Sequence, residues 1–207
     1  MWAGNVWNTS VGSLWLNTIS IIWSALDTLP LNYSHSNNIY ITSKLNLFMK
    51  VYNTIIELLK SHHISYRSLE HKETLTSEDS AKERGERIEV GGKAILLKID
   101  ENFKLFVMRA CDKLHSKAIK KKFKAKKVRF ATHDELMELT GLVSGSVPPF
   151  GKPILPFELY IDSLVFTNEI IAFNAGSLTH SIILDIKDYE KVTEFETFNF
   201  VKEDSNE

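Results

Sequence analysis

The chain has 207 residues, of which 43% are apolar and 25% are charged, and its formal net charge is -1. This composition predicts one globular domain with a hydrophobic core, and it excludes a general electrostatic attraction to polyanions such as DNA. The single cysteine, Cys111, excludes an internal disulfide and a four-cysteine zinc site, and it fits a reducing, cytoplasmic compartment.

The first 48 residues differ in composition from the rest of the chain. Asp27 is the only charged residue in residues 1–43, and the apolar run from Val11 to Leu26 is interrupted by hydroxyl and amide side chains. That run is shorter than the roughly 20 apolar residues of a membrane span, so we expect no stable membrane association. The prediction is a poorly ordered or non-native, dispensable extension over residues 1–48, followed by a single domain over residues 49–207.

The first part of the domain shows alternating helix and strand patterns. Residues 50–60 place apolar side chains on one helical face, and residues 64–69 follow as a short strand. Residues 76–85 have a threonine N-cap, an acidic first turn and a glycine stop, which predicts a short helix. Two apolar strands, residues 93–99 and 103–110, then form a predicted hairpin.

The segment from Lys113 to Arg129 is strongly basic, and within it residues 116–123 have the pattern of a helix. Two interpretations remain open for its lysines. They are either a solvated helix face or a patch that binds RNA phosphates, because a local basic cluster in a nearly neutral protein is the footprint that phosphate binding requires. The candidate tRNA-binding residues are Lys120, Lys121, Lys122 and Lys124.

A strand is expected at residues 128–131, then a capping box from Thr132 to Glu135 and a helix that ends at Gly141. The following loop, residues 141–151, contains three glycines and two adjacent prolines, so sterics rather than ladder hydrogen bonds set its path. It is either a ligand-facing loop or a helix cap followed by an ordinary turn. Further strands are expected at residues 157–162, 170–174 and 179–184, with a closing helix at 188–192. This order predicts a mixed α+β domain.

A glycine pair, Gly91-Gly92, precedes Lys93 at the start of a predicted strand. The order of several segments along the chain resembles the YbaK family, which comprises editing domains related to the insertion domain of bacterial prolyl-tRNA synthetase. The resemblance extends over about residues 52–192. It is carried by residues 92–98, 126–132, 138–141, 145–151, 160–162 and 173–176.

The resemblance implies a single-domain fold with a bent mixed β-sheet surrounded by short helices. It also implies hydrolysis of the ester between a wrongly attached amino acid and the terminal ribose of tRNA. The site residues that the resemblance implies are Lys93, Gly145 and Ser146 for catalysis, and Pro149, Asp162, Gly176 and His180 for substrate binding. Two of these assignments have alternatives: Asp162 could instead cap a turn, and His180 could be a proton carrier or have a structural or substrate-orienting role.

The expected substrate is alanyl- or cysteinyl-tRNA that carries the proline anticodon, and prolyl-tRNA synthetase is a candidate partner. No cofactor is expected, because positioned amides and an ammonium suffice for an activated ester, and the sequence contains no metalloprotease, serine-hydrolase or P-loop pattern. One alternative is a tRNA- or RNA-binding module with the same fold and no hydrolysis. A weaker alternative is a membrane-associated role of the apolar N-terminus.

Overall fold

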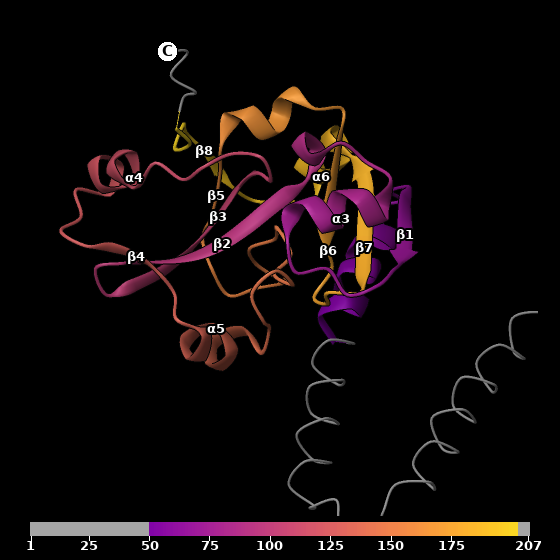
Figure 1. Cartoon of the computed structure of the whole chain (residues 1–207), viewed down its shortest axis with the longest axis horizontal. Coiled ribbons are helices and arrows are strands. Elements are labelled where there is room, and N and C mark those ends of the chain that lie inside the picture. The colour runs from indigo at the N-terminus through magenta and orange to yellow at the C-terminus, as the bar shows by residue number, and fades with distance from the viewer. Residues whose placement is uncertain (1–49, 203–207) are drawn as a thin grey trace, which may run out of the picture. The chain divides into compact units, whose positions relative to one another are not determined.

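The computed structural model describes residues 50–202 (Figure 1). The predicted extension over residues 1–48 lies outside this range. Within residues 50–202, none of the helices combines the length and the apolar character that crossing a membrane would require.

The strands form two sheets. The first is antiparallel, with strand order β1-β7-β6, and the second is mixed, with order β4-β2-β3-β5-β8 (Figure 1). In the second sheet β4, β2 and β3 pair antiparallel, whereas β3–β5 and β5–β8 pair parallel. The bounds are β1 Tyr66–Glu70, β2 Gly92–Ile99, β3 Asn102–Arg109, β4 Val128–Phe130, β5 Leu159–Ile161, β6 Ile170–Asn174, β7 His180–Asp185 and β8 Glu196–Thr197.

Short helices surround the sheets, and their ends follow the capping residues in the sequence. Thr132 and Glu135 form the predicted capping box at the start of α5, and Gly141 ends this helix with φ +68°. The side chain of Asp185 accepts a hydrogen bond from the Lys187 N–H, so the last helix begins at Ile186, before the predicted residue 188. The helices are residues 50–61, α3 Ser77–Arg84, α4 Ser116–Phe123, α5 His133–Thr140 and α6 Ile186–Lys191, with 3-10 turns at Ile88–Val90 and Ser163–Thr167.

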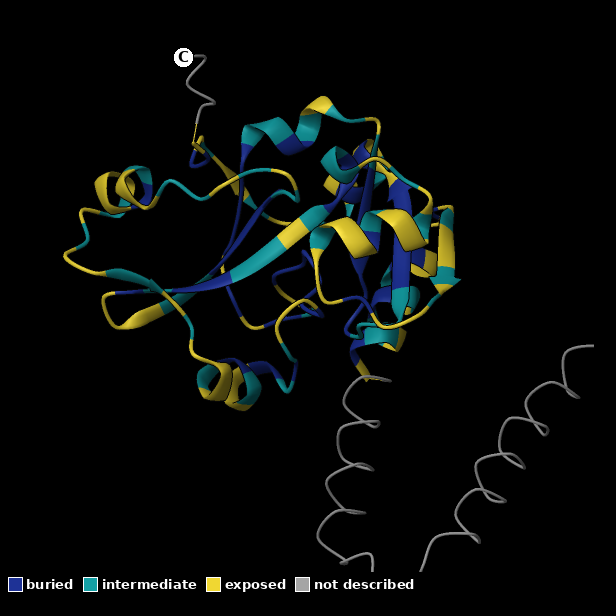
Figure 2. Cartoon of the chain, in the orientation of Figure 1, coloured by how far each residue is buried: buried dark blue, intermediate teal, exposed yellow. Residues whose placement is uncertain are grey.

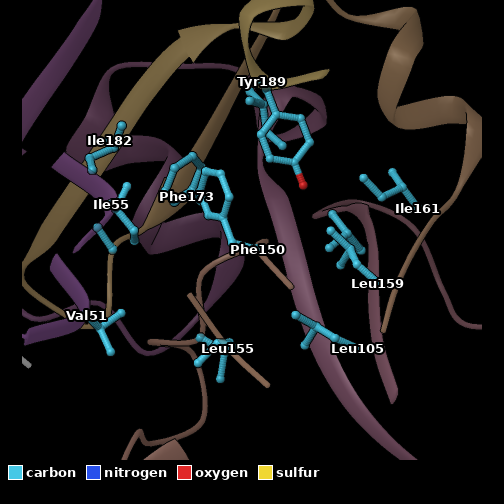
Figure 3. Close-up of a cluster of buried hydrophobic side chains, with 14 of the residues drawn as sticks. Val51, Ile55, Leu105, Phe150, Leu155, Leu159, Ile161, Phe173, Ile182 and Tyr189 are labelled. Atoms are coloured by element: carbon cyan, nitrogen blue, oxygen red, sulfur yellow. The ribbon is translucent and has the colours of Figure 1, made fainter. Parts of the chain in front are cut away.

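The main hydrophobic core lies between the two sheets and the helix of residues 50–61. Val51 and Ile55 from that helix, Leu105 from β3 and Phe173 from β6 belong to this cluster (Figure 3). The buried Tyr189 donates its hydroxyl hydrogen to the Pro149 carbonyl, so the core holds the loop of residues 141–151, the Pro-rich loop, in place.

A second core covers the opposite face of the five-stranded sheet. Phe106, Ile119 from α4, Tyr160 and Phe200 are buried there, while the outer faces of α4 and α5 are exposed (Figure 2). The C-terminal residues 196–201, which include β8, complete this cluster. The sequence did not predict them as an element, because two residues of strand carry too little periodicity to be recognised.

The predicted α+β class is confirmed, and the bent mixed sheet takes the form of two sheets joined at one point. Gly91 forms a parallel bridge with Ala172 of β6, and the strand that follows Gly91 is β2 of the other sheet. The strand expected at residues 157–162 is only Leu159–Ile161, since Phe157 is still held in a turn by a hydrogen bond to the Leu155 carbonyl.

Candidate active site

A cavity of about 490 Å³ lies beside the edge of β2. Strand β4 pairs with β2 only from Leu97 to Ile99, so it leaves the earlier part of that edge without a neighbouring strand. The open edge is instead surrounded by the start of α3, the β4–α5 connection and the Pro-rich loop, all of which line the cavity. The cavity therefore exists because one strand of the sheet is shorter than its neighbour.

Lys93 lies on this edge, and its side chain is exposed. It forms no ion pair with any of the residues 50–202. The backbone of the two preceding glycines packs tightly against its neighbours and so fixes the start of the strand. A Cβ on Gly92 would lie 2.7 Å from Ile171 Cδ1, and one on Gly91 would lie 2.7 Å from Ala110 Cβ. The backbone of Lys93 therefore has a well-defined place on the cavity wall, and its ammonium is available to a ligand.

The Pro-rich loop contributes backbone donors to the same cavity. Ser144 and Gly145 line it, and Gly145 has φ +86°, a conformation that favours glycine. Within the described part of the chain, the N–H groups of these two residues have no hydrogen-bond acceptor. Ser146 is buried and faces away from the cavity, since its N–H donates to the Val143 carbonyl at 3.1 Å and its hydroxyl bonds both Val143 backbone groups.

A polar network holds this loop in position. The Asn174 side chain donates to the Gly145 carbonyl at 2.9 Å and accepts from Arg84 Nη2 at 2.6 Å, and Arg84 Nε donates to the Ser181 hydroxyl at 2.8 Å. Burial lowers the pKa of Arg84 to about 10, so the guanidinium remains cationic at neutral pH. Arg84 and Asn174 both line the cavity, and no carboxylate among residues 50–202 pairs with this arginine.

Two of the residues that the resemblance assigned to substrate binding support the loop instead of lining the cavity. Gly176, with φ +83°, donates its N–H to the Ser146 carbonyl at 3.0 Å. The Pro149 carbonyl is the acceptor for the Tyr189 hydroxyl. Both contacts therefore support the loop on a side that does not line the cavity.

Asp162 is fully buried and accepts three backbone N–H bonds. Its Oδ1 accepts from Leu164 at 3.0 Å, and its Oδ2 accepts from Phe200 at 2.6 Å and Val201 at 3.1 Å. The carboxylate therefore caps a 3-10 turn and anchors the C-terminal segment, which is the alternative that the sequence left open. It does not line the cavity.

His180 also lies away from the cavity wall. Its ring packs edge-on against Tyr52, with ring centroids 5.8 Å apart, and its Nδ1 lies 2.9 Å from the Thr179 hydroxyl. Burial lowers its pKa. On β7 it shares a face with the core residue Ile182 and is opposite to Ser181, which contacts Arg84, and this arrangement favours a structural role.

The candidate tRNA-binding lysines, three in α4 and Lys124 at its C-cap, are exposed but not equivalent. Lys122 forms an ion pair with Glu196, and its Nζ lies 5.4 Å from the ring centroid of Phe198. Lys120, Lys121 and Lys124 form no ion pair within residues 50–202. None of the four lines the cavity, so any tRNA contact that they make is separate from it.

Sequence reasoning missed two residues that shape the site. Asn174 lies inside the stretch from Phe173 to Gly176 that carried the resemblance, so a polar residue in an otherwise apolar strand could have indicated it. Arg84 had no such signal, because a basic residue in the last turn of a short helix is ordinarily a favourable partner of the helix dipole.

An unpaired ammonium and two free backbone N–H groups around one cavity define a site that can polarise an ester carbonyl. Residues 71–192 match the model of a family described as aminoacyl-tRNA editing domain, and the chain belongs to this family. This membership confirms the resemblance, and with it the enzyme class, an aminoacyl-tRNA deacylase.

Individual relatives agree with this family. The chain is 31% identical over 152 residues to the multifunctional Ser/Thr-tRNA deacylase ProXp-y of Escherichia coli strain K12, in a match that covers 70% of this chain and 90% of the relative. A solved structure of a putative trans-editing enzyme for prolyl tRNA synthetase aligns with a TM-score of 0.64 at 19% identity, over 74% of this chain and 98% of that one. Hypothetical protein APE2540 aligns with a TM-score of 0.64 at 20% identity, over 72% and 99%. These structures support the fold.

Proposed function

We propose that the chain hydrolyses mischarged aminoacyl-tRNA in trans and that the reaction takes place in the cavity beside β2. The observation that carries the proposal is the combination of an unpaired Lys93 with the free N–H groups of Ser144 and Gly145 around one cavity. Such donors can be directed at the oxygen on which negative charge develops during ester hydrolysis.

In the proposed reaction, water attacks the carbonyl carbon of the ester, and the bond to the ribose oxygen breaks. The products are a free amino acid and a tRNA with an intact terminal hydroxyl. Lys93 and the loop stabilise the oxyanion of the tetrahedral intermediate, while Arg84 and Asn174 keep the loop in place through the Gly145 carbonyl. In this proposal the reaction needs neither a metal nor a nucleotide cofactor, because an aminoacyl ester is already activated.

The lining of the cavity favours a small polar aminoacyl group. It includes the polar residues Thr74, Ser80, Arg84 and Asn174, and all of these except Arg84 are classed as buried. These groups bond one another or the backbone, and the hydrogen-bonding capacity that Thr74, Arg84 and Asn174 retain could serve a polar aminoacyl group. Together with the name of the Escherichia coli relative, this makes seryl- and threonyl-tRNA the first candidates, ahead of the alanyl- and cysteinyl-tRNA of the proline type expected from the sequence.

We expect a measurable deacylation rate on at least one member of a panel of seryl-, threonyl-, alanyl- and cysteinyl-tRNAs, assayed with chelator present. The comparison is the spontaneous hydrolysis of each ester under the same conditions. If every ester decays at its spontaneous rate while tRNA still binds, the alternative of a non-catalytic tRNA-binding module replaces this proposal. The same proposal places the enzyme in the cytoplasm, where it acts on free aminoacyl-tRNA and has prolyl-tRNA synthetase as a candidate partner.

The lysines of α4 provide a test of how tRNA is held. Replacing Lys120, Lys121 and Lys124 with alanine should weaken tRNA binding and lower the slope of log affinity against log salt by roughly one for each phosphate that is no longer neutralised. The rate at saturating tRNA should not change, since these residues lie outside the cavity. Lys122→Ala is the matched control, because Lys122 is already paired with Glu196 and should contribute less. An unchanged salt slope in the triple variant would mean that this helix face is only solvated.

A further inference from the structure

The rim of the cavity carries two exposed apolar side chains. Phe130 is 58% exposed and Leu75 is 76% exposed, and both line the cavity. Only one other large hydrophobic side chain in residues 50–202, Leu139, is similarly exposed, at 39%, and it lies outside the cavity. Exposure of a large apolar side chain to water is unfavourable. Two such side chains at one cavity therefore indicate a ligand that covers them.

The register of the sheet places Phe130 and Lys93 on the same face, at a separation that a nucleoside could span. Phe130 pairs directly with Leu97, and directly paired residues point to the same face of a sheet. Lys93 shares that face with Leu97, because the two are separated by an even number of residues along β2. Four residues of strand correspond to about 13 Å, a separation that the two long side chains and a nucleoside ester between them can span.

We propose that Phe130 and Leu75 form the binding site for the terminal base of the tRNA substrate, with the Phe130 ring stacked on the base. This inference rests on the proposed function, because the ester held near Lys93 is covalently joined to the ribose that bears this base. Within the described residues, no other aromatic ring packs against Phe130, and more than half of its surface is exposed, which leaves ring surface on which a base could stack.

The charges beside Phe130 fit a nucleic-acid ligand. Lys126 and Lys127 immediately precede its strand, both are exposed, and neither forms an ion pair within residues 50–202. Their backbone N–H groups bond Asp100, which fixes this part of the chain while the ammonium groups remain available. An exposed aromatic ring near exposed cations is an arrangement with which proteins hold single-stranded nucleotides.

The test uses a non-hydrolysable probe, adenosine in which the 3′-oxygen is replaced by an amide-linked serine, and a second probe that lacks the base. Wild type should bind the adenosine probe, and Phe130→Ala should weaken this binding by about tenfold or more, on the scale of one stacked base. Phe130→Trp should restore binding because it restores an aromatic face. Leu75→Ala should weaken binding to a smaller extent. Leu139→Ala, an exposed apolar residue outside the cavity, is the matched control and should bind as wild type does.

The probe without the base distinguishes stacking from a general disturbance of the site, since Phe130→Ala should not change its binding. Equal affinity of wild type and Phe130→Ala for the adenosine probe overturns the inference, and so does absence of binding by folded wild type at millimolar probe. Failure of the proposed function gives a different result, in which the probe binds through Phe130 but no aminoacyl-tRNA is hydrolysed.

Discussion

Replacing Lys93 with alanine should remove most of the deacylation activity and leave the fold intact. The ammonium is exposed and has no ion-pair partner among residues 50–202, so its removal leaves no buried group unsatisfied. Removal of one positioned charge at the reacting carbonyl costs about 2–4 kcal/mol in the barrier, which corresponds to roughly a hundredfold or more in rate. Single-turnover hydrolysis by wild type and variant, with circular dichroism to verify folding, measures this effect.

Arginine at this position should restore little activity. A guanidinium is planar and wider than an ammonium, and its donors would reach a different place in a cavity whose opposite wall is held by Asn174 and Gly176. Lys98→Ala is a suitable control, because Lys98 lies on the same strand but outside the cavity. Nearly normal hydrolysis by folded Lys93→Ala would place the chemistry elsewhere.

Asp162→Ala should destabilise the protein strongly without acting on substrate directly. The substitution leaves the N–H groups of Leu164, Phe200 and Val201 without their buried acceptor. Each unsatisfied buried donor costs about 1–3 kcal/mol, so a total decrease of at least about 3 kcal/mol in the free energy of unfolding is expected, a large part of the stability of a small domain. Urea unfolding followed by circular dichroism measures it.

Asp185→Ala provides the contrast for this experiment. Asp185 also caps a helix, but it is exposed and accepts a single backbone bond, from Lys187, so its replacement should cost only about 1 kcal/mol. A variant Asp162→Ala with wild-type stability and reduced hydrolysis would instead support the substrate-binding role that the sequence suggested.

The helices and long strands could be predicted because their signals are local. The capping box at Thr132, the glycine stops at Gly85 and Gly141, and the apolar runs of β2 and β3 each determine a boundary within a few residues. The short strand β8 could not be predicted, since its formation depends on the side of β5 being available for pairing. That information lies in the tertiary structure.

The same distinction applies to the site. Lys93 and Gly145 could be assigned to one site only through the family resemblance that their ordered glycine and proline patterns carry, and the structure brings both to one cavity. The sequence patterns around Ser146, Pro149 and Gly176 are equally distinctive. The contacts of these residues nevertheless keep the loop in position and do not line the cavity. A sequence pattern can indicate that the backbone at a position is constrained. Packing between segments that are distant in the sequence decides whether the donors at that position face a ligand or the core.

The bridge between Gly91 and Ala172 makes the site a joint between two separately hydrogen-bonded sheets. Lys93 belongs to one sheet, whereas Asn174, which sets the position of Gly145, belongs to the other. Neither sheet alone carries a complete set of donors. In the proposed reaction, the arrangement of the donors is therefore a property of the docked pair of sheets, and the close packing of the Ile171 side chain against the backbone of Gly92 is part of that arrangement. The two sheets must keep this packing for Lys93 and Gly145 to line the same cavity.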